Sequence, residues 1–543
     1  MKNIEVIKDC CEYANVEYPK CHTINFDDED VWADMIECPI GIFQFESDFA
    51  SKTLKEFEPH KINDLSLVNA SIRPSGSSYR DDLIAKKPHK NPSKLIDDLL
   101  ADNNGYLVFQ EDTIAFLQNI CGLSGSDADN IRRAIGRKQR DRLEKAMPQI
   151  LEGYCSKSDK PRKEAEEEAK AFLQIIEDSA NYQFGKNHST GYSIIGYYCA
   201  YFRYYYPLEF TTSYLNNANN SEDINDGHEL AKVKGITIKP PKFRYSRAEY
   251  FMDKETNSIY KGMASIKYMN AQVSEELYEL KDNQYNNFMD LLIDIYDKTS
   301  INSRQLNILI AIDFFEEFGK SQKLLDIVDL YDKIMSKKLK SKKGEVTFNK
   351  TDLPYPKDII EKYATEKSKE DKYKQYKVEK ALELCNELMN DIPNIEMYSI
   401  DKVRINLEMM GECNYHFEDY SPTTCVVVDV ITKYKTKRAW LFNIASGKTK
   451  EIKVGEAYYN LQPFKALDVL DVYSITSKPK KEQREVQVED KDGNIITKKK
   501  WFPTDELEFY CDEYHLLDED EVEELNKMER EYILENIYRE GLL

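Results

Sequence analysis

Apolar residues recur at helical spacing in the first part of the chain. Positions three or four apart mark predicted helices at residues 4–13, 112–120, 127–135, 164–176 and 193–206. Loops with proline and glycine separate them, and Ser71–Gly76 is a clear turn signal. The pattern therefore predicts a mainly helical region over residues 38–218.

Beyond residue 422 the pattern changes to short β-branched runs. Strands are predicted at Cys425–Ile431, Ala439–Ile444 and Leu467–Ile475. Asp492-Gly493-Asn494 is a hairpin signal between residues 485–488 and 495–500. About five strands over this length fit a small barrel of the oligonucleotide-binding type. The expected fold class is α+β and multidomain, with helical regions preceding this barrel.

These changes of pattern divide the chain into six expected segments. They are a remnant or linker at 1–37, a helical domain at 38–218, a helical middle domain at 219–345, a charged helical connector at 346–421, the barrel at 422–515 and an acidic C-terminal helix at 516–543. The Lys-rich stretch within residues 336–380 is expected to be an exposed connection.

Composition narrows the class of protein. The 543 residues include 97 acidic and 76 basic side chains, a net charge of −21, which excludes a uniformly basic nucleic-acid coat protein. The 11 cysteines are dispersed and favour a reducing cytoplasm. No apolar run is long enough to cross a bilayer, so we expect a cytoplasmic protein without a membrane partner.

A basic helix carries the first candidate chemistry. Ser126-Asp127-Ala128-Asp129 is predicted as its capping box, and Arg132 and Arg133 project from it. More cations follow at Arg137, Lys138, Arg140 and Arg142. Guanidinium groups bind phosphate oxygens well, so the helix suits a triphosphate or a nucleic-acid backbone. Taken alone, the same pattern also describes a solvated basic face.

A second cluster lies at residues 184–192. Ser189 or Thr190 is expected to cap the following helix, which places Lys186 and His188 at its positive end. The aromatic run at 192–206 is typical of a core, although such rings can also stack on bases. Within that run, Arg203 is the expected nucleic-acid contact.

Carboxylate clusters give no metal site on this chain. Asp27, Asp28 and Asp30 lie in a polar linker context, and Glu519–Glu521 belong to an acidic tail. Neither has the apolar strand setting that holds a metal carboxylate rigid. Phosphate-binding loop, dinucleotide-binding and zinc-protease motifs are also missing from the sequence.

Six segments together resemble the fingers of the C-family bacterial replicative polymerases, the α subunit of DNA polymerase III. They are Gly41–Ser47 (similar to GVFQFES), Leu67–Pro74 (LNALYRPGP), Gly105–Asp112 (YGVIVYQEQ), Asp129–Lys138 (DLLRRAMGKK), Phe184–Ser189 (FNKSHA) and Tyr206–Phe210 (YPAEF). Their order and approximate spacing are kept. Residues 229–320 resemble, more weakly, the family's clamp-binding and helix-hairpin-helix part.

The resemblance implies roles for the cationic residues. Arg132 and Arg133 would contact the triphosphate of the incoming nucleotide, with Arg73, Lys186 and His188 in the same pocket. The basic run from Arg137 to Arg142 would approach the phosphates of primer-template DNA. A sliding clamp is a further partner of this family, for which Gln322–Leu325 is a weak candidate peptide.

Three departures from the family shape the functional hypothesis. The palm aspartates have no counterpart, and Lys2–Ile7 resembles the stretch that follows the last of them. Ile266–Asn270 lacks the hairpin glycines, and Pro74-Ser75-Gly76 replaces Pro-Gly-Pro. We therefore expect the C-terminal half of a split polymerase, whose palm and Mg²⁺ come from another polypeptide. The alternative is a non-catalytic DNA-binding replication factor derived from a polymerase.

Overall fold

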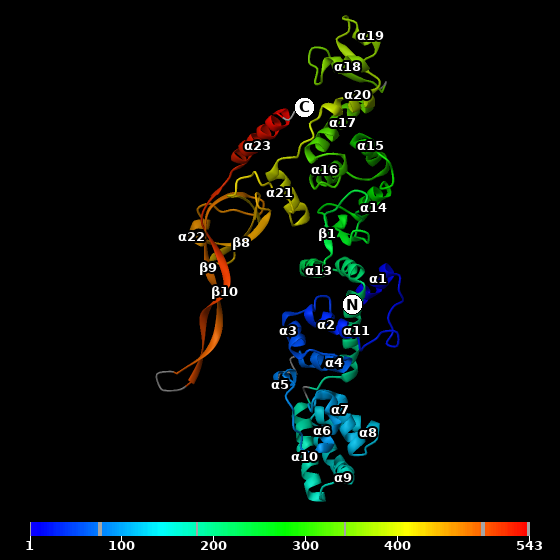
Figure 1. The fold of residues 1–543 in the computed structure, drawn as a ribbon, viewed down its shortest axis with the longest axis vertical. Helices are drawn as coiled ribbons and strands as arrows, with labels where there is room; N and C mark the ends of the chain where they lie inside the picture. Colours follow the sequence, from blue (N-terminus) through cyan, green and yellow to red (C-terminus); the bar gives the residue numbers. More distant parts are fainter. Residues whose placement is uncertain (1, 74–78, 181–182, 341–343, 490–494, 540–543) are drawn as a thin grey trace. The chain divides into compact units, whose positions relative to one another are not determined.

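The computed structural model describes residues 2–73, 79–180, 183–340, 344–489 and 495–539. The chain divides into two compact units, the first formed by Met1–Lys239 with Met252–Ile259 and the second by Pro240–Phe251 with Tyr260–Leu543. Helices and sheets both contribute, which confirms the α+β multidomain prediction (Figure 1).

One core of the first unit gathers helices from both ends of its sequence. The helices are α1 (Lys2–Ala14), α2 (Glu29–Glu37), α3 (Asp48–Phe57), α4 (Ile62–Ser71), α5 (Arg80–Ile84), α11 (Lys186–Tyr205), α12 (Pro207–Asn216) and α13 (Ser221–Val233). Val6, Trp32, Tyr197 and Phe210 are all buried in this core. Residues 1–37, expected as a remnant or linker, therefore pack with the fingers region, and the core has no boundary at residue 37.

A second core in the same unit surrounds Phe116, Tyr154 and Phe172. Its elements are α6 (Lys94–Leu99), η2 (Ala101–Asn103), α7 (Gln110–Ala115), the π-helical turn η3 (Phe116–Ile120), α8 (Gly125–Gly136), α9 (Arg140–Lys157) and α10 (Arg162–Ser179). Gly153 lets α9 approach η3, because a Cβ there would lie 1.8 Å from the carbonyl oxygen of Cys121.

Two helix starts differ from the sequence prediction. Helix α8 is capped by Ser124, whose Oγ accepts the Asp127 N–H at 3.2 Å, so the predicted cap at Ser126 is wrong by two residues. Helix α11 begins at Lys186 after Gly185, so Ser189 and Thr190 lie inside the helix and do not cap it.

A small sheet and a helical core follow in the chain. Strands β1 (Thr237–Lys239), β2 (Phe251–Asp253) and β3 (Ser258–Tyr260) pair in the order β1-β3-β2. The helical core contains η4 (Met263–Ser265), α14 (Ala271–Glu279), α15 (Phe288–Lys298), α16 (Ser303–Ala311), η5 (Glu316–Phe318) and α17 (Ser321–Lys340).

The charged connector is also folded. It contains β4 (Val346–Asn349), α18 (Lys357–Tyr363), α19 (Glu366–Lys369), β5 (Gln375–Val378), α20 (Ala381–Leu388), η6 (Met389–Asp391) and α21 (Ser399–Met410). Strands β4 and β5 pair antiparallel, and Ile360, Tyr376 and Leu384 are buried in the same core as the preceding helices. The expected exposed connection is therefore wrong for much of this stretch.

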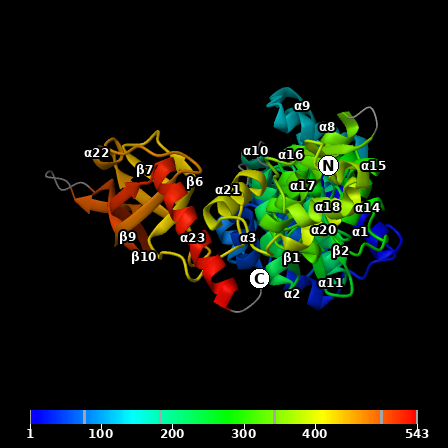
Figure 2. The same ribbon diagram turned by 90° about the horizontal axis from the view of Figure 1, so that it is seen from above.

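Five strands close into a barrel, as the β-branched runs predicted (Figure 2). They are β6 (Thr424–Ile431), β7 (Thr436–Asn443), β8 (Lys448–Gly455), β9 (Val469–Glu489) and β10 (Ile495–Leu516), with α22 (Glu456–Tyr459) between β8 and β9. The order is β10-β8-β7-β6-β9, and β10 runs parallel to β8. The oligonucleotide-binding assignment of this barrel stays a prediction.

Strands β9 and β10 continue beyond the barrel as a long antiparallel ribbon. Their pairing runs from Leu516 opposite Leu470 to Ile495 opposite Glu489, whereas β8 pairs with β10 only near Tyr510 and Cys511. The predicted turn residues Asp492–Asn494 lie outside the described residues, but the two strands that they would join are hydrogen-bonded as a hairpin.

The acidic C-terminal helix α23 (Glu519–Arg539) follows the barrel. Leu517 and Val522 pack with Val403 of α21 and with Val426 and Phe442 of the barrel. These contacts attach the barrel to α21 on one side. Within the described parts of the chain, no helix is both long enough and apolar enough to cross a bilayer.

Candidate nucleotide and nucleic-acid interface

A short parallel bridge organises the candidate site. The Gln110 N–H donates to the Phe184 carbonyl at 2.9 Å, and the Phe184 N–H donates to the Val108 carbonyl at 3.1 Å. The bridge joins segments more than seventy residues apart and sets the first turn of α7 beside the first turn of α11. We call this meeting point the Gln110–Phe184 junction.

A buried carboxylate, that of Asp112, stabilises the backbone of the junction. Asp112 accepts hydrogen bonds from the backbone N–H groups of Phe109 at 2.8 Å and Val108 at 3.3 Å, and from the Asn103 amide at 2.9 Å. Burial raises the pKa of Asp112 above its ordinary value, although these hydrogen bonds oppose the shift. The carboxylate thus fixes the backbone that presents Gln110.

Lys186 and His188 lie in the first turn of α11, inside the helix and not ahead of it as the predicted cap at Ser189 or Thr190 required. The Lys186 N–H donates to the Glu111 carboxylate at 2.7 Å, and its Nζ lies 5.6 Å from the centre of the Phe109 ring. The His188 ring stacks against Tyr192 with 4.0 Å between centroids. Both residues therefore stand at the positive end of a twenty-residue helix, where anions are favoured.

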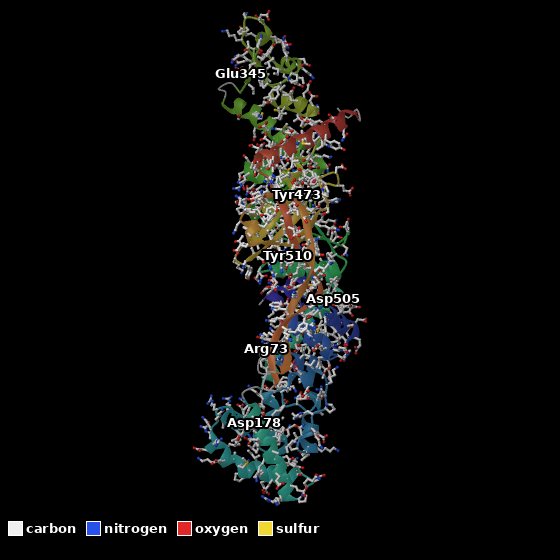
Figure 3. All side chains as sticks on the ribbon, turned by 90° about the vertical axis from the view of Figure 1, so that its left-hand side faces the viewer. Arg73, Asp178, Glu345, Tyr473, Asp505 and Tyr510 are labelled. Carbon is white, nitrogen blue, oxygen red and sulfur yellow. The ribbon has the colours of Figure 1, made fainter. Side chains whose placement is uncertain are left out.

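Arg73, which is labelled in Figure 3, follows the end of α4 by two residues and reaches the same junction. Its Nη2 donates to Gln44 Oε1 at 2.5 Å, and its guanidinium lies 5.5 Å from the centre of the Phe184 ring. Gln44 adopts a left-handed backbone with φ of 76°, an uncommon conformation for a residue with a side chain. Among the described residues, Arg73 Nε is buried without a hydrogen-bond partner. The predicted Pro-Ser-Gly departure at 74–76 lies outside the described residues.

Arg132 and Arg133 of α8 share one carboxylate. Arg132 donates through Nε and Nη2 to Asp129 Oδ1 at 3.0 and 2.9 Å, and through Nη1 to Gln110 Oε1 at 2.9 Å. Arg133 Nη2 lies 2.8 Å from Asp129 Oδ2. Hydrogen bonds from Arg132 and then from Arg133 hold the pKa of Asp129 below its ordinary value. Gln110 therefore links the arginine helix to the junction.

A pocket opens beside these arginines. It is lined by the polar residues Arg132, Arg133, Arg137 and Gln183 and by the apolar residues Ile135, Ile176 and Ala180. Four exposed cations follow the pocket: Arg137 and Lys138 in the turn after α8, and Arg140 and Arg142 in the first turn of α9. Across the described residues, none of these four cations forms an ion pair within 4.0 Å. They form a cationic edge open to solvent.

Arg203 is not part of this surface. Its side chain is fully buried, and it donates to Asp34 Oδ2 at 2.6 Å and to the Ile40 carbonyl at 2.6 Å. The prediction that Arg203 contacts nucleic acid is therefore wrong, because its guanidinium is enclosed and saturated by partners within the protein. Most of the preceding aromatic run is likewise core, with Tyr197 and Phe202 buried.

The hairpin without glycines keeps a glycine-like backbone at one position. Tyr268 has a φ of 71°, and Asn270 caps α14 by accepting the Val273 N–H at 2.9 Å. The Tyr268 ring lies 3.5 Å from the Arg304 guanidinium, and its carbonyl accepts from the Gln305 side chain at 2.9 Å. The turn is thus stabilised by side chains where the family uses glycine.

The described carboxylates do not assemble a metal centre. No group of three or more His, Cys, Asp or Glu side chains converges in the described parts of the chain. Asp28 accepts the Val31 N–H at the start of α2 and the Tyr205 hydroxyl at 2.7 Å. Glu519 pairs with Arg404 at 3.1 Å, and Glu521 pairs with His515 at 2.9 Å. These acids serve the fold, and the residues present do not fit a pair of catalytic Mg²⁺ ions.

Sequence reasoning missed the residues that orient the cations. Four residues that belong to the motif segments, but were given no role, each contact a predicted site residue: Asp129, Gln110, Glu111 and Gln44. Asp129 carried a usable signal, since it precedes Arg132 and Arg133 by three and four positions on one helix. Gln44 and Gln110 carried none, because their partners are distant in sequence.

Two stretches of the chain match known protein families. Residues 3–158 match the bacterial DNA polymerase III alpha subunit finger domain, and residues 235–325 match a helix-hairpin-helix motif. The chain is therefore homologous to a part of the DNA polymerase III alpha subunit that includes its finger domain.

Several alpha subunits align with more than half of the chain. The Treponema pallidum subunit is 30% identical over 323 residues, which cover 58% of this chain and 27% of the relative. The Bacillus subtilis subunit is 28% identical over 52% of this chain and 25% of the relative, and the Campylobacter jejuni subunit is 29% identical over 60% and 28%. The aligned region spans about a quarter of the length of these relatives.

Proposed function

We propose that this chain binds the triphosphate of the incoming nucleotide and the primer-template during DNA-directed DNA synthesis. The observation that carries the proposal is the convergence at the Gln110–Phe184 junction. Arg73 and Lys186 approach its two phenylalanine rings, His188 packs on Phe184, and Gln110 holds Arg132. Cations from three helices thus surround one point, and a polyphosphate is the substrate group that such a cluster would neutralise.

In the proposed active site, another polypeptide binds the metal ions. In this proposal a palm-bearing partner contributes the aspartates that hold Mg²⁺, which supply Lewis-acid activation of the phosphoryl group. The support from this chain is that the acids of its two carboxylate clusters have structural partners, since Asp28 caps α2 and Glu519 pairs with Arg404. The residues of the first unit would bind and orient the nucleotide while the partner holds the metal.

DNA contacts are proposed along the cationic edge and at the barrel. Arg137, Lys138, Arg140 and Arg142 are exposed and suit backbone phosphates. On the barrel, Lys450 lies 3.5 Å from the Phe509 ring, and Lys478 lies 4.7 Å from the Tyr510 ring, which gives cations next to aromatic faces. Figure 3 shows Tyr473 and Tyr510 on the same pair of strands.

A sliding-clamp contact at Gln322–Leu325 has little support. These residues form the first turn of α17, where Leu324 is buried and Gln322 donates to Asp326 at 2.9 Å. A clamp peptide must present such side chains outward, so any clamp would contact another segment. The cytoplasm remains the proposed location, and no disulfide joins cysteines in the described residues.

Primer extension tests the proposal. We expect no synthesis by the purified chain and template-dependent synthesis after addition of a palm-bearing polypeptide from the same source. Synthesis by the chain alone would overturn the division of the active site. Activity that stays absent with every co-purifying palm protein would favour a non-catalytic DNA-binding replication factor.

The residue test is the double variant Arg132→Ala with Arg133→Ala in the reconstituted enzyme. We expect KM for the nucleotide to rise at least tenfold, because two phosphate-binding groups are lost. Lys163→Ala is the matched control, since this exposed cation lies on α10 of the same unit. An unchanged KM with normal folding would remove the proposed role of α8.

A further inference from the structure

The two neighbouring arginines of α8 are held very differently. Arg132 makes three hydrogen bonds and keeps 21% of its side chain exposed, whereas Arg133 makes one ion pair and keeps 58% exposed. Within α8, both arginines contact the same side chain, the carboxylate of Asp129. Arg132 contacts Oδ1 of this carboxylate and Arg133 contacts Oδ2, so each arginine has one oxygen of its own.

Arg132 is fixed from two directions. Asp129 Oδ1 accepts from Nε and Nη2, which holds one edge of the guanidinium plane. Gln110 accepts from Nη1, and Gln110 is itself tied through its backbone to Phe184 and through its Nε2 to the Gln183 carbonyl at 3.3 Å. A guanidinium held on both edges keeps its orientation, and it retains N–H groups for one further acceptor.

Among the described residues, Asp129 is the partner that holds Arg133. Its Nη2 contacts Oδ2 at 2.8 Å, and the rest of its guanidinium faces solvent and the pocket that it shares with Arg137. A single exposed ion pair between side chains is weak and exchanges readily. A polyphosphate carries several negative charges and more acceptor oxygens than one carboxylate, so it competes well for this group.

We propose that Asp129 is a positioning residue that makes the two arginines non-equivalent. It keeps Arg132 in place as a preoriented phosphate donor, and it releases Arg133 to the polyphosphate when the nucleotide enters. Arg133 then joins Arg137, the residue that follows α8, on the pocket side. In the empty site Asp129 serves as the counter-ion of Arg133. This inference rests on the proposed nucleotide-binding function and specifies how its arginines work.

The substitution Asp129→Asn separates the two roles of the carboxylate. It removes the negative charge that competes for Arg133, so the full chain should bind inorganic tripolyphosphate about three- to tenfold more tightly in calorimetry at low salt. It also weakens the fixation of Arg132, so kcat of the reconstituted polymerase should fall by about tenfold or more without a rise in KM. Tighter binding with slower turnover is a combination that a purely structural role would not produce.

Asp141→Asn is the charge-matched control. Asp141 is exposed in the first turn of α9. Its replacement by asparagine removes one negative charge from the same region without changing a partner of Arg132 or Arg133. We expect less than a twofold change in tripolyphosphate binding for this variant. Equal effects of Asp129→Asn and Asp141→Asn, or weaker binding by Asp129→Asn with an unchanged melting temperature, would overturn the inference.

Further variants distinguish a failure of the proposed role of Asp129 from a failure of the proposed nucleotide binding. Arg133→Ala should abolish the gain that Asp129→Asn produces, because the released group is then missing. Gln110→Ala should lower kcat without tightening tripolyphosphate binding, since it loosens Arg132 and leaves Asp129 on Arg133. If the unaltered chain binds neither tripolyphosphate nor nucleotide, the proposed function fails. If the unaltered chain binds both and Asp129→Asn behaves like its control, only the role of Asp129 fails.

Discussion

Arg203 and Asp34 form a buried ion pair that connects α11 to α2. The Arg203 side chain is fully enclosed and that of Asp34 is 12% exposed, with 3.0 Å from Nε and 2.6 Å from Nη2 to Asp34 Oδ2. Lys234 contacts the other carboxylate oxygen, and the Ile40 carbonyl accepts from Nη1. The guanidinium thus has partners on each edge, and the pair secures the N-terminal segment to the long helix.

Breaking this pair should destabilise the first unit. Arg203→Ala leaves Asp34 Oδ2 and the Ile40 carbonyl without their arginine donor, although Lys234 still contacts Asp34 Oδ1. Loss of one partner of a buried ion pair costs about 3–5 kcal/mol in the free energy of unfolding. Chemical denaturation followed by circular dichroism measures the loss. The exposed Lys163→Ala should stay within about 0.5 kcal/mol of the unaltered protein. A similar small effect for both variants would contradict the structural role of Arg203.

Two glycines of the first unit should respond oppositely to alanine. At Gly153 a Cβ would meet the Cys121 backbone at 1.8 Å from oxygen and 2.4 Å from carbon, so Gly153→Ala should destabilise by about 3 kcal/mol. At Gly136, the last residue of α8, no heavy atom lies within 4 Å of the added group. Gly136→Ala should therefore be neutral or stabilising by up to about 1 kcal/mol. Thermal unfolding would show both effects, and a tolerated alanine at 153 would refute the close packing of α9 on η3.

The buried Asp112 should give a specific pH dependence of stability. Burial raises its pKa in the folded protein, so the folded state binds this proton more tightly than the unfolded state. Its contribution to stability is therefore largest below the unfolded pKa near 4 and declines as pH rises through the raised folded value. Unfolding of the unaltered protein and of Asp112→Asn between about pH 3 and 7 isolates this contribution as a difference. We expect the free energy of unfolding of the unaltered protein to fall, relative to that of Asp112→Asn, as pH rises. A rise of this relative stability with pH would contradict the prediction.

The cationic edge should determine how strongly DNA binding depends on salt. If Arg137, Lys138, Arg140 and Arg142 each contact one phosphate, their joint replacement by alanine should lower the magnitude of the log–log salt slope by about 3–4. Fluorescence anisotropy with a labelled primer-template gives the slope. Replacing the exposed lysines Lys52, Lys55, Lys90 and Lys94 of the same unit removes the same formal charge elsewhere. An equal change of slope for both quadruple variants would show that only net charge matters.

The outer ribbon offers a fluorescence test of the barrel. Trp501 is 65% exposed on β10, whereas Trp32 is buried and Trp440 is half-buried. Single-stranded DNA should quench the emission of the protein by stacking on Trp501, and Trp501→Phe should remove most of that quenching. Trp440→Phe should leave it nearly intact. Quenching that persists in Trp501→Phe would place the DNA contact away from the ribbon.

Local patterns predicted much of the fold because those elements depend on neighbouring residues. The β-branched runs around Val426 and Leu441 indicated the barrel strands, and the apolar stripe of Ile131 and Ile135 indicated α8. The start of α11 was missed because Lys186 is held by Glu111, a residue 75 positions away. Helix boundaries that depend on such distant partners leave no mark in the local sequence.

The site was predicted at the level of residue types and less well at the level of roles. The resemblance grouped Arg73, Lys186, His188 and Arg132 in one pocket. In the structure each contacts a residue of the Gln110–Phe184 junction or its neighbour Phe109, while only Arg132 of the four lines the pocket beside α8. Arg203 was assigned to nucleic acid as the cation within the aromatic run, yet its partner Asp34 lies 169 positions earlier in the chain. A buried ion pair between distant residues cannot be distinguished from a surface cation by spacing alone.

The packing of helix α1 has a practical consequence for dissecting the protein. Val6, Ile7 and Cys10 are fully enclosed, and the Val6 carbonyl accepts from the Ser213 hydroxyl at 2.8 Å. Removing residues 2–14 to trim an apparent tail would uncover the apolar surfaces of α11 and α12 and promote aggregation. Shortened versions made for crystallisation or binding work should therefore retain this opening helix.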